Sequence, residues 1–181
     1  MELGHLQVLF DEAGKLTKQT EFVVVGSLSI LGIVPGSEIP ARMLMSIDVD
    51  CYTRADPGRI FELSSALGAG SPFEEKHGYY LDPISPDVLT LPQGWEPRLV
   101  PVKLQNKITV FFLDPNDAAV SKYARCEIRD REWIAAGLEA QLLSAPIIES
   151  RFRQTRFFDD AERERAGKAL TEDRARKAVP S

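Results

Sequence analysis

The stretch Ser46-Ile-Asp48-Val-Asp50-Cys51 places two carboxylates two positions apart inside a run that is typical of an extended strand. We predict this strand over residues 43–52, with Asp48 and Asp50 on one face and an apolar opposite face, because side chains alternate across the pleat. Uncompensated carboxylates in a core are costly, so the acidic face must meet water, basic groups or a metal. Two converging carboxylates suit Mg²⁺. A plain solvent-facing strand explains the same alternation equally well.

A second informative stretch lies upstream, at Val23-Val-Val-Gly26-Ser27. The apolar, β-branched run over 21–25 predicts a strand buried on both faces. Gly26-Ser27 ends it and leads into a short helix over residues 28–33. A glycine turn between a strand and a helix lets backbone N–H groups approach an anion. The same turn is also an ordinary strand-to-helix connection.

The rest of the chain alternates helical and extended patterns, which predicts an α+β (α/β-like) fold with one small mixed sheet flanked by helices. We divide the chain into a domain over residues 1–146 and a charged helical tail over 147–181. The further helices are expected over residues 3–18, from Asp56-Pro57 to Gly68, over 115–126, 129–143 and 158–177, and Pro146 is expected to end the fourth of these. The further strands are expected over residues 79–81, 87–91, 99–104 and 108–113, the last two as a hairpin.

Composition narrows the class of protein. The 181 residues are 44% hydrophobic and 27% charged, which is ordinary for a soluble domain. The two cysteines are far apart in the sequence, which excludes a disulfide framework. We find no apolar run that predicts a membrane span and no basic leader that predicts a signal peptide. We therefore expect a cytoplasmic protein.

The charge is unevenly distributed along the chain. The net charge of −5 divides into −8 for residues 1–150, with 13 basic and 21 acidic side chains, and +3 for 151–181, with nine basic and six acidic ones. The acidic body argues against DNA binding. The mixed-charge tail is suited to contact with a protein partner or with a second copy of the chain.

Together, the two stretches resemble the signature of the nucleotidyltransferase superfamily, which has the DNA polymerase β-like fold. That signature is a hydrophobic strand, Gly-Gly or Gly-Ser, a short helix, and Asp-hydrophobic-Asp on the next strand. The chain is similar in particular to an uncharacterised bacterial branch of small nucleotidyltransferase-like proteins, some of which resemble antitoxin or defence components. Segments 88–99, 113–122 and 129–134 are similar to segments of that branch. The resemblance covers roughly residues 5–143.

The resemblance implies a nucleotidyltransferase fold and roles for individual residues. Asp48 and Asp50 would be catalytic carboxylates that hold Mg²⁺ or Mn²⁺, and Gly26 and Ser27 would contact the triphosphate of an NTP. The interval between Gly26 and Asp48 is longer than in the smallest members, with a proline- and glycine-containing insertion over residues 35–40.

Two further positions complete the predicted site. The third catalytic carboxylate is expected to be Asp87, which opens the short strand over 87–91, with Asp82 as the alternative. Both lie beside prolines, and a turn-capping role explains either one as well. Lys122 is expected to contact nucleotide phosphates from a helix, paired with Asp130 beside the cleft, whereas a solvated helix face is the simpler explanation.

The predicted function is a metal-dependent transfer of a nucleoside monophosphate from an NTP to an acceptor hydroxyl on a protein, an RNA end or a small molecule. The alternative is a catalytically weak or inactive nucleotidyltransferase-like binding protein, such as an antitoxin or a complex subunit. A soluble domain with a solvent-facing acidic strand is the third hypothesis.

Overall fold

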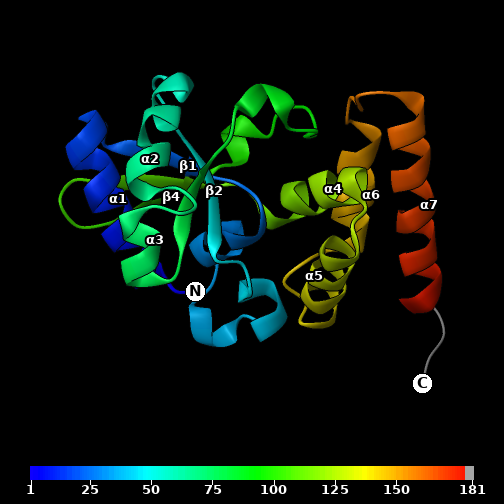
Figure 1. Ribbon diagram of the computed structural model, residues 1–181. Helices are drawn as coiled ribbons and strands as arrows, with labels where there is room; N and C mark the ends of the chain where they lie inside the picture. Colours follow the sequence, from blue (N-terminus) through cyan, green and yellow to red (C-terminus); the bar gives the residue numbers. More distant parts are fainter. Residues whose placement is uncertain (178–181) are drawn as a thin grey trace.

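A five-stranded mixed sheet forms the centre of one half of the molecule, and four helices form most of the other half (Figure 1). The computed structural model describes residues 1–177. The strands are β1 (Glu21–Val24), β2 (Asp48–Thr53), β3 (Tyr80–Pro83), β4 (Val100–Lys103) and β5 (Thr109–Phe112). The expected α+β class with a small mixed sheet is confirmed.

The strand order in space is β3-β2-β1-β5-β4. β1 pairs antiparallel with β2 and parallel with β5, while β2 and β3 run parallel and β4 and β5 antiparallel. The expected hairpin is therefore present as β4 and β5. The acidic strand β2 lies between β1, which leads into the Gly26-Ser27 turn, and β3.

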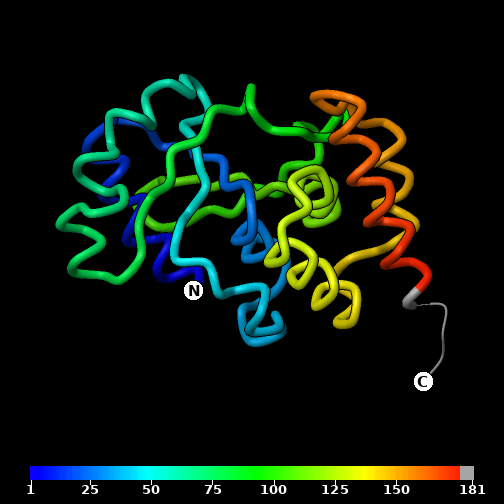
Figure 2. Tube along the Cα trace, turned by 45° about the vertical axis from the view of Figure 1, so that its right-hand side comes forward, coloured from blue at the N-terminus to red at the C-terminus, as the bar shows by residue number. Residues whose placement is uncertain are grey.

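Helices fall into two groups along the chain. The α-helices are α1 (Leu3–Thr17), α2 (Ser64–Leu67), α3 (Pro72–His77), α4 (Pro115–Arg125), α5 (Ile128–Glu139), α6 (Ala145–Arg153) and α7 (Asp160–Lys177). The 3-10 helices are η1 (Ser27–Gly32), η2 (Gly36–Glu38), η3 (Ala41–Leu44), η4 (Pro57–Leu63), η5 (Pro86–Val88) and η6 (Glu96–Arg98). Helices α1 to α3 lie beside the sheet, whereas α4 to α7 pack together at the other end of the molecule (Figures 1 and 2).

The core of the sheet half is apolar because β1 is buried and α1 covers it. Phe22 on β1 stacks on Phe10 of α1, with ring centroids 4.8 Å apart. The same face of the sheet is also approached by η1, where a Cβ on Gly32 would lie 2.2 Å from the ring of Phe112, so the backbone there comes close to β5. Burial of these side chains positions the turn between β1 and η1 above the acidic strand.

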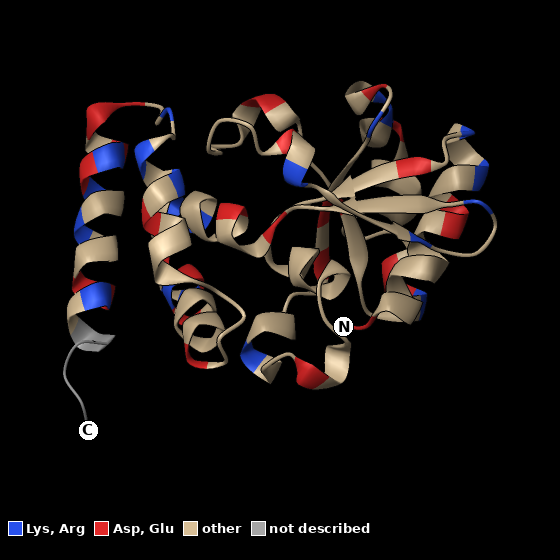
Figure 3. Ribbon diagram, turned by 180° about the vertical axis from the view of Figure 1, so that it is seen from behind, with Lys and Arg blue, Asp and Glu red and all other residues tan. Residues whose placement is uncertain are grey.

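Helix α4 joins the two halves of the molecule. Asp114 caps its N-terminus, and α4 packs against η1 as well as against α5, α6 and α7. Helix α7 carries closely spaced acidic and basic residues along its length (Figure 3), yet it buries Ala166 and Ala169. Helix α7 is held against α4 and α5, because Arg131 and Tyr123 donate hydrogen bonds to the carboxylate of Asp173, at 2.6 Å and 3.1 Å respectively.

Prolines explain three of the differences between the predicted elements and the structure. The strand expected over 43–52 starts only at Asp48, because Pro40 opens η3 over Ala41–Leu44. The strand expected over 87–91 is absent, since Pro86 starts η5. Pro146 was expected to end a helix, but it lies in the first turn of α6, where its missing N–H costs nothing.

None of the helices within residues 1–177 is long and apolar enough to cross a membrane.

Candidate functional site

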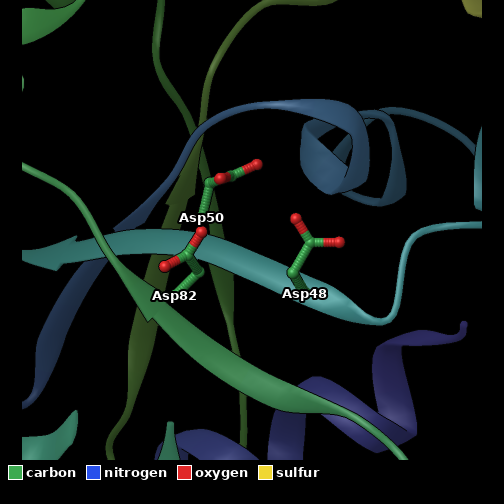
Figure 4. A group of neighbouring side chains, drawn as sticks. All are labelled: Asp48, Asp50 and Asp82. Atoms are coloured by element: carbon green, nitrogen blue, oxygen red, sulfur yellow. The ribbon is translucent and has the colours of Figure 1, made fainter. Parts of the chain in front are cut away.

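Three carboxylates meet on two neighbouring strands (Figure 4). Asp48 and Asp50 extend from the same face of β2, and Asp82 joins them from β3. One oxygen of each of the three carboxylates lies within 4.8 Å of the others. The parallel register of β2 and β3 produces this cluster, because it puts Asp50 directly opposite Asp82. Oxygen ligands at this spacing fit a divalent cation such as Mg²⁺.

Burial and neighbouring acids raise the pKa of Asp50 and of Asp82. Burial, followed by the negative charges of Asp48 and Asp82, raises the pKa of Asp50 from its ordinary 3.8 to about 6. Burial and the charge of Asp48 also raise the pKa of Asp82. The carboxylates are therefore held together against their mutual repulsion, a cost that a bound cation would offset.

Gly26 lies directly against the acidic cluster. Its φ of +66° and ψ of −151° belong to a region that only glycine adopts readily. A Cβ at this position would lie 2.0 Å from Oδ2 of Asp50. The N–H of the preceding residue, Val25, donates to the backbone carbonyl of Asp50 at 2.9 Å. The turn after β1 and the acidic strand β2 are thus in contact, as the sequence motif predicts.

Ser46 supports the first carboxylate from the segment before β2. Its hydroxyl donates to Oδ1 of Asp48, which orients that side chain toward the cluster. The sequence did not predict this role for Ser46. The i,i+2 spacing of a serine and an aspartate at a strand start is the only signal, and it is a common one.

Basic side chains form the wall opposite the three aspartates. The Nζ of Lys122, on α4, donates to Oγ of Ser27 at 2.9 Å and to Oδ1 of Asp130, on α5, at 3.1 Å. Arg125 donates to both oxygens of Asp130, at 2.7 Å and 3.2 Å. The buried carboxylate of Asp130 therefore holds two cations beside the Gly26-Ser27 turn.

Lys122 is buried, with only 2% of its side chain exposed. Burial, aided by the positive charge of Arg125, lowers the pKa of its ammonium group. Its Nζ also lies 4.9 Å from the ring centroid of Trp133. The expected pairing of Lys122 with Asp130 is confirmed as a contact, whereas a solvated helix face is excluded for Lys122 by its burial.

A cavity of about 360 Å³ lies between the acidic cluster and this cationic wall. We call it the carboxylate cavity. Beside the residues already named, Arg42 and Arg129 line it from η3 and α5. Each of these arginines has an acidic neighbour, Glu132 for Arg42 and Glu127 for Arg129. The cavity thus combines three carboxylates suited to a cation with basic groups suited to phosphates.

Asp82, the alternative third acid, is the residue that joins the cluster. Asp87 lies on η5, where its side chain is exposed and lines a different cavity together with Arg156 and Phe157. Its backbone N–H donates to the hydroxyl of Ser85, so Ser85, rather than Asp87, caps η5. Sequence spacing could not separate the two aspartates, because only the parallel pairing of β2 with β3 brings Asp82 opposite Asp50.

A mixed sheet that carries three carboxylates on two adjacent strands beside a Gly-Ser turn is the arrangement that the nucleotidyltransferase resemblance implies. The chain belongs to the family described as "Nucleotidyltransferase of unknown function (DUF6036)", which it matches over residues 4–177. The match extends beyond the motifs in residues 5–143 and includes α6 and α7. Comparisons with curated proteins and with solved structures gave no significant match.

Proposed function

We propose that the protein is a metal-dependent nucleotidyltransferase that moves a nucleoside monophosphate from an NTP to an acceptor hydroxyl. The observation that carries the proposal is the convergence of Asp48, Asp50 and Asp82 within 4.8 Å beside the Gly26-Ser27 turn. Membership of a nucleotidyltransferase family supports the same reaction class.

The donor set of the site fits a hard divalent cation. Asp48, Asp50 and Asp82 would hold Mg²⁺ or Mn²⁺, which supplies charge neutralisation for phosphates and lowers the pKa of a coordinated hydroxyl. The mutual repulsion of the three carboxylates favours an occupied site over an empty one.

The triphosphate is expected on the side of Gly26 and Ser27. The missing Cβ of Gly26 leaves the backbone accessible close to Asp50, and Ser27 begins η1, so backbone N–H groups and a hydroxyl are available there. Lys122 already contacts Ser27, and Arg125 lies one helical turn further along α4. These cations would neutralise the departing pyrophosphate.

The bond changes are those of an in-line displacement. A bond forms between the acceptor oxygen and the α-phosphorus, the bond to the bridging oxygen of pyrophosphate breaks, and the hydroxyl proton passes to solvent. Asp48, Asp50 and Asp82 orient the reacting groups, while Lys122 and Arg125 stabilise the negative charge that develops on the leaving group.

Calorimetric titration with ATP, CTP, GTP and UTP tests the proposal, with and without Mg²⁺. We expect Mg²⁺-dependent binding of at least one NTP, and its loss in Asp48→Asn and Asp50→Asn. Mg²⁺-dependent label transfer from an α-³²P-labelled NTP, to the chain itself or to an added lysate, tests the chemistry. NTP binding without any transfer would refute catalysis and leave the binding-protein alternative. The absence of NTP binding would refute the proposal entirely.

The third carboxylate has its own matched pair of variants. Asp82→Asn removes an acid from the cluster, whereas Asp87→Asn removes an exposed acid on η5. We expect the first variant to weaken Mn²⁺ binding and to abolish transfer, and the second to behave as the unaltered chain. The opposite order of effects would restore Asp87 as the third acid.

A further inference from the structure

We propose that a groove between residues 87–90 and residues 156–158 joins two copies of the chain into a symmetric dimer, in which Phe158 of each copy enters the groove of the other. The groove has a volume of about 630 Å³, and its lining includes the apolar Val88, Leu89, Phe157 and Phe158 and the charged Asp87 and Arg156. We call it the Phe158 groove. The inference goes beyond the proposed function and does not depend on it.

Large apolar side chains are exposed on both sides of the Phe158 groove. Phe158, in the connection between α6 and α7 (Figure 1), is 91% exposed, and Val88, at the end of η5, is 71% exposed. Apolar side chains that gather in one place on a surface are typical of contact sites. Both side chains lose their unfavourable contact with water if a second protein surface covers them.

Hydrogen bonds hold the two sides of the groove together. The carboxylate of Glu162 accepts from the hydroxyl of Thr90 on one side, at 3.0 Å, and from the backbone N–H of Phe158 on the other, at 2.6 Å. Just outside the groove, the N–H of Gln93 donates to the backbone carbonyl of Gln154 at 3.1 Å. The groove is therefore preformed, and a partner need not order these segments in order to bind.

The charges in the groove favour a second copy as its occupant. Asp87 and Arg156 both line the groove, yet neither forms an ion pair within residues 1–177. A uniformly acidic or basic partner would match one of these charges and repel the other. A second copy turned about a two-fold axis matches both, because Asp87 of each copy then faces Arg156 of the other.

The shape of the surface favours the same occupant. A two-fold contact requires a surface that is complementary to itself. The Phe158 groove meets this requirement, because the exposed ring of Phe158 lies beside a hollow whose wall contains Val88, Leu89 and Phe157. The ring of Phe157 is held by Phe152 of α6, with ring centroids 4.8 Å apart. Each copy thus offers one protruding ring and one apolar hollow.

The area available predicts a weak dimer. A phenylalanine side chain buries about 150–250 Å², so the two Phe158 rings supply at most about 500 Å². Stable interfaces bury about 1,200–2,000 Å² in total. The contact is therefore expected to form at high protein concentration and to dissociate on dilution.

Sedimentation velocity of the full chain, without metal or NTP, tests the dimer over about 1 µM to about 1 mM. We expect the mass to rise from that of one chain toward that of two. Phe158→Asp should weaken the association at least about tenfold. Ile128→Asp, at a residue of α5 that is 80% exposed, should leave it unchanged. A chain that stays monomeric throughout, or equal effects of the two variants, would overturn the proposal.

A charge exchange tests the two-fold arrangement itself. Asp87→Lys and Arg156→Glu should each weaken the association about tenfold, because each places like charges opposite one another at both contacts. An equimolar mixture of these two singly altered chains should recover the original affinity, since every contact in the mixed pair then joins opposite charges. No recovery in the mixture would refute the two-fold contact through this groove.

Discussion

At the scale of single residues, the site depends on a few residues whose proposed role in function conflicts with the stability of the protein. Asp50 is the clearest case, because burial and two neighbouring acids disfavour its charge while the proposed chemistry requires it. Gly26 is the second, since its backbone conformation and its closeness to Asp50 leave no room for a side chain. Such positions trade stability for function, which makes them sensitive to substitution in predictable directions.

Gly26→Ala should destabilise the protein and disturb the acidic cluster. The backbone strain alone costs about 1–3 kcal/mol, and the new Cβ would meet the carboxylate of Asp50. Gly36→Ala is the matched control, because Gly36 has ordinary dihedral angles and open space around it. Chemical denaturation of both variants measures the difference. Equal stability of the two variants would show that the turn tolerates a side chain.

Asp50→Asn should stabilise the metal-free protein in a pH-dependent way. The pKa of Asp50 is raised from 3.8 to about 6, so its contribution to stability is fully present below about pH 4 and is lost as the pH rises through 6. By neutral pH the free energy of unfolding has fallen by about 3 kcal/mol through this residue. The variant, which cannot ionise there, should exceed the unaltered chain in Tm at pH 7 to 8 in EDTA, with a gap that closes toward pH 4. A gap that does not vary with pH would contradict the assigned pKa.

At the scale of elements, helices α4 and α5 supply the basic side chains for a site whose three carboxylates lie on strands. The Lys122 side of α4 and the Asp130 side of α5 face each other, so one buried carboxylate positions both Lys122 and Arg125. The strands contribute acids and the helices contribute bases, and the carboxylate cavity lies where they meet.

Asp130→Ala should destabilise the α4–α5 pair strongly. Removing one partner of a buried ion pair leaves an uncompensated charge and costs about 3–5 kcal/mol, here reduced to the extent that Lys122 gives up its proton. Glu127→Ala is the control, because its pair with Arg129 is exposed and is worth less than about 1 kcal/mol. Urea denaturation compares them, and similar losses would refute the structural role of Asp130. The double variant Lys122→Met/Asp130→Leu should recover much of the stability.

At the scale of the whole molecule, the charged C-terminal part is packed onto the rest of the chain. Arg151 of α6 forms an ion pair with Asp114 at 2.5 Å, and it lies 3.1 Å from the carboxylate of the fully buried Asp117 of α4. Arg98, at the end of η6, forms an ion pair with the same Asp117 at 2.8 Å. The division into 1–146 and 147–181 stays our proposal for the organisation of the chain, and these contacts predict that the two parts unfold together.

Arg151→Ala should lower the stability of the entire chain by about 1–3 kcal/mol, because Asp114 loses a hydrogen bond and the buried Asp117 loses an ion-pair partner. Arg153→Ala, at an exposed position of the same helix, should change little. Far-UV circular dichroism and tryptophan fluorescence should report one shared transition for both variants. A separate early transition of the C-terminal helices would show that residues 147–181 are an independent unit.

The sequence by itself determined the periodic elements and the two motifs. The alternation around Asp48 and Asp50, the buried run before Gly26, the hairpin and the helical spacing of the longer helices depend on local patterns. All are present in the structure, although the acidic strand and several helices have other bounds than expected. Two predictions near prolines were wrong, because a proline can begin a helix as well as interrupt one. Pro86 begins η5, and Pro146 lies in the first turn of α6. The tertiary structure alone decided that Asp82, rather than Asp87, joins the acidic pair, because strand pairing is a non-local interaction. It likewise brought Lys122 and Asp130 to Ser27, since only packing of distant elements makes residues so far apart in the chain neighbours.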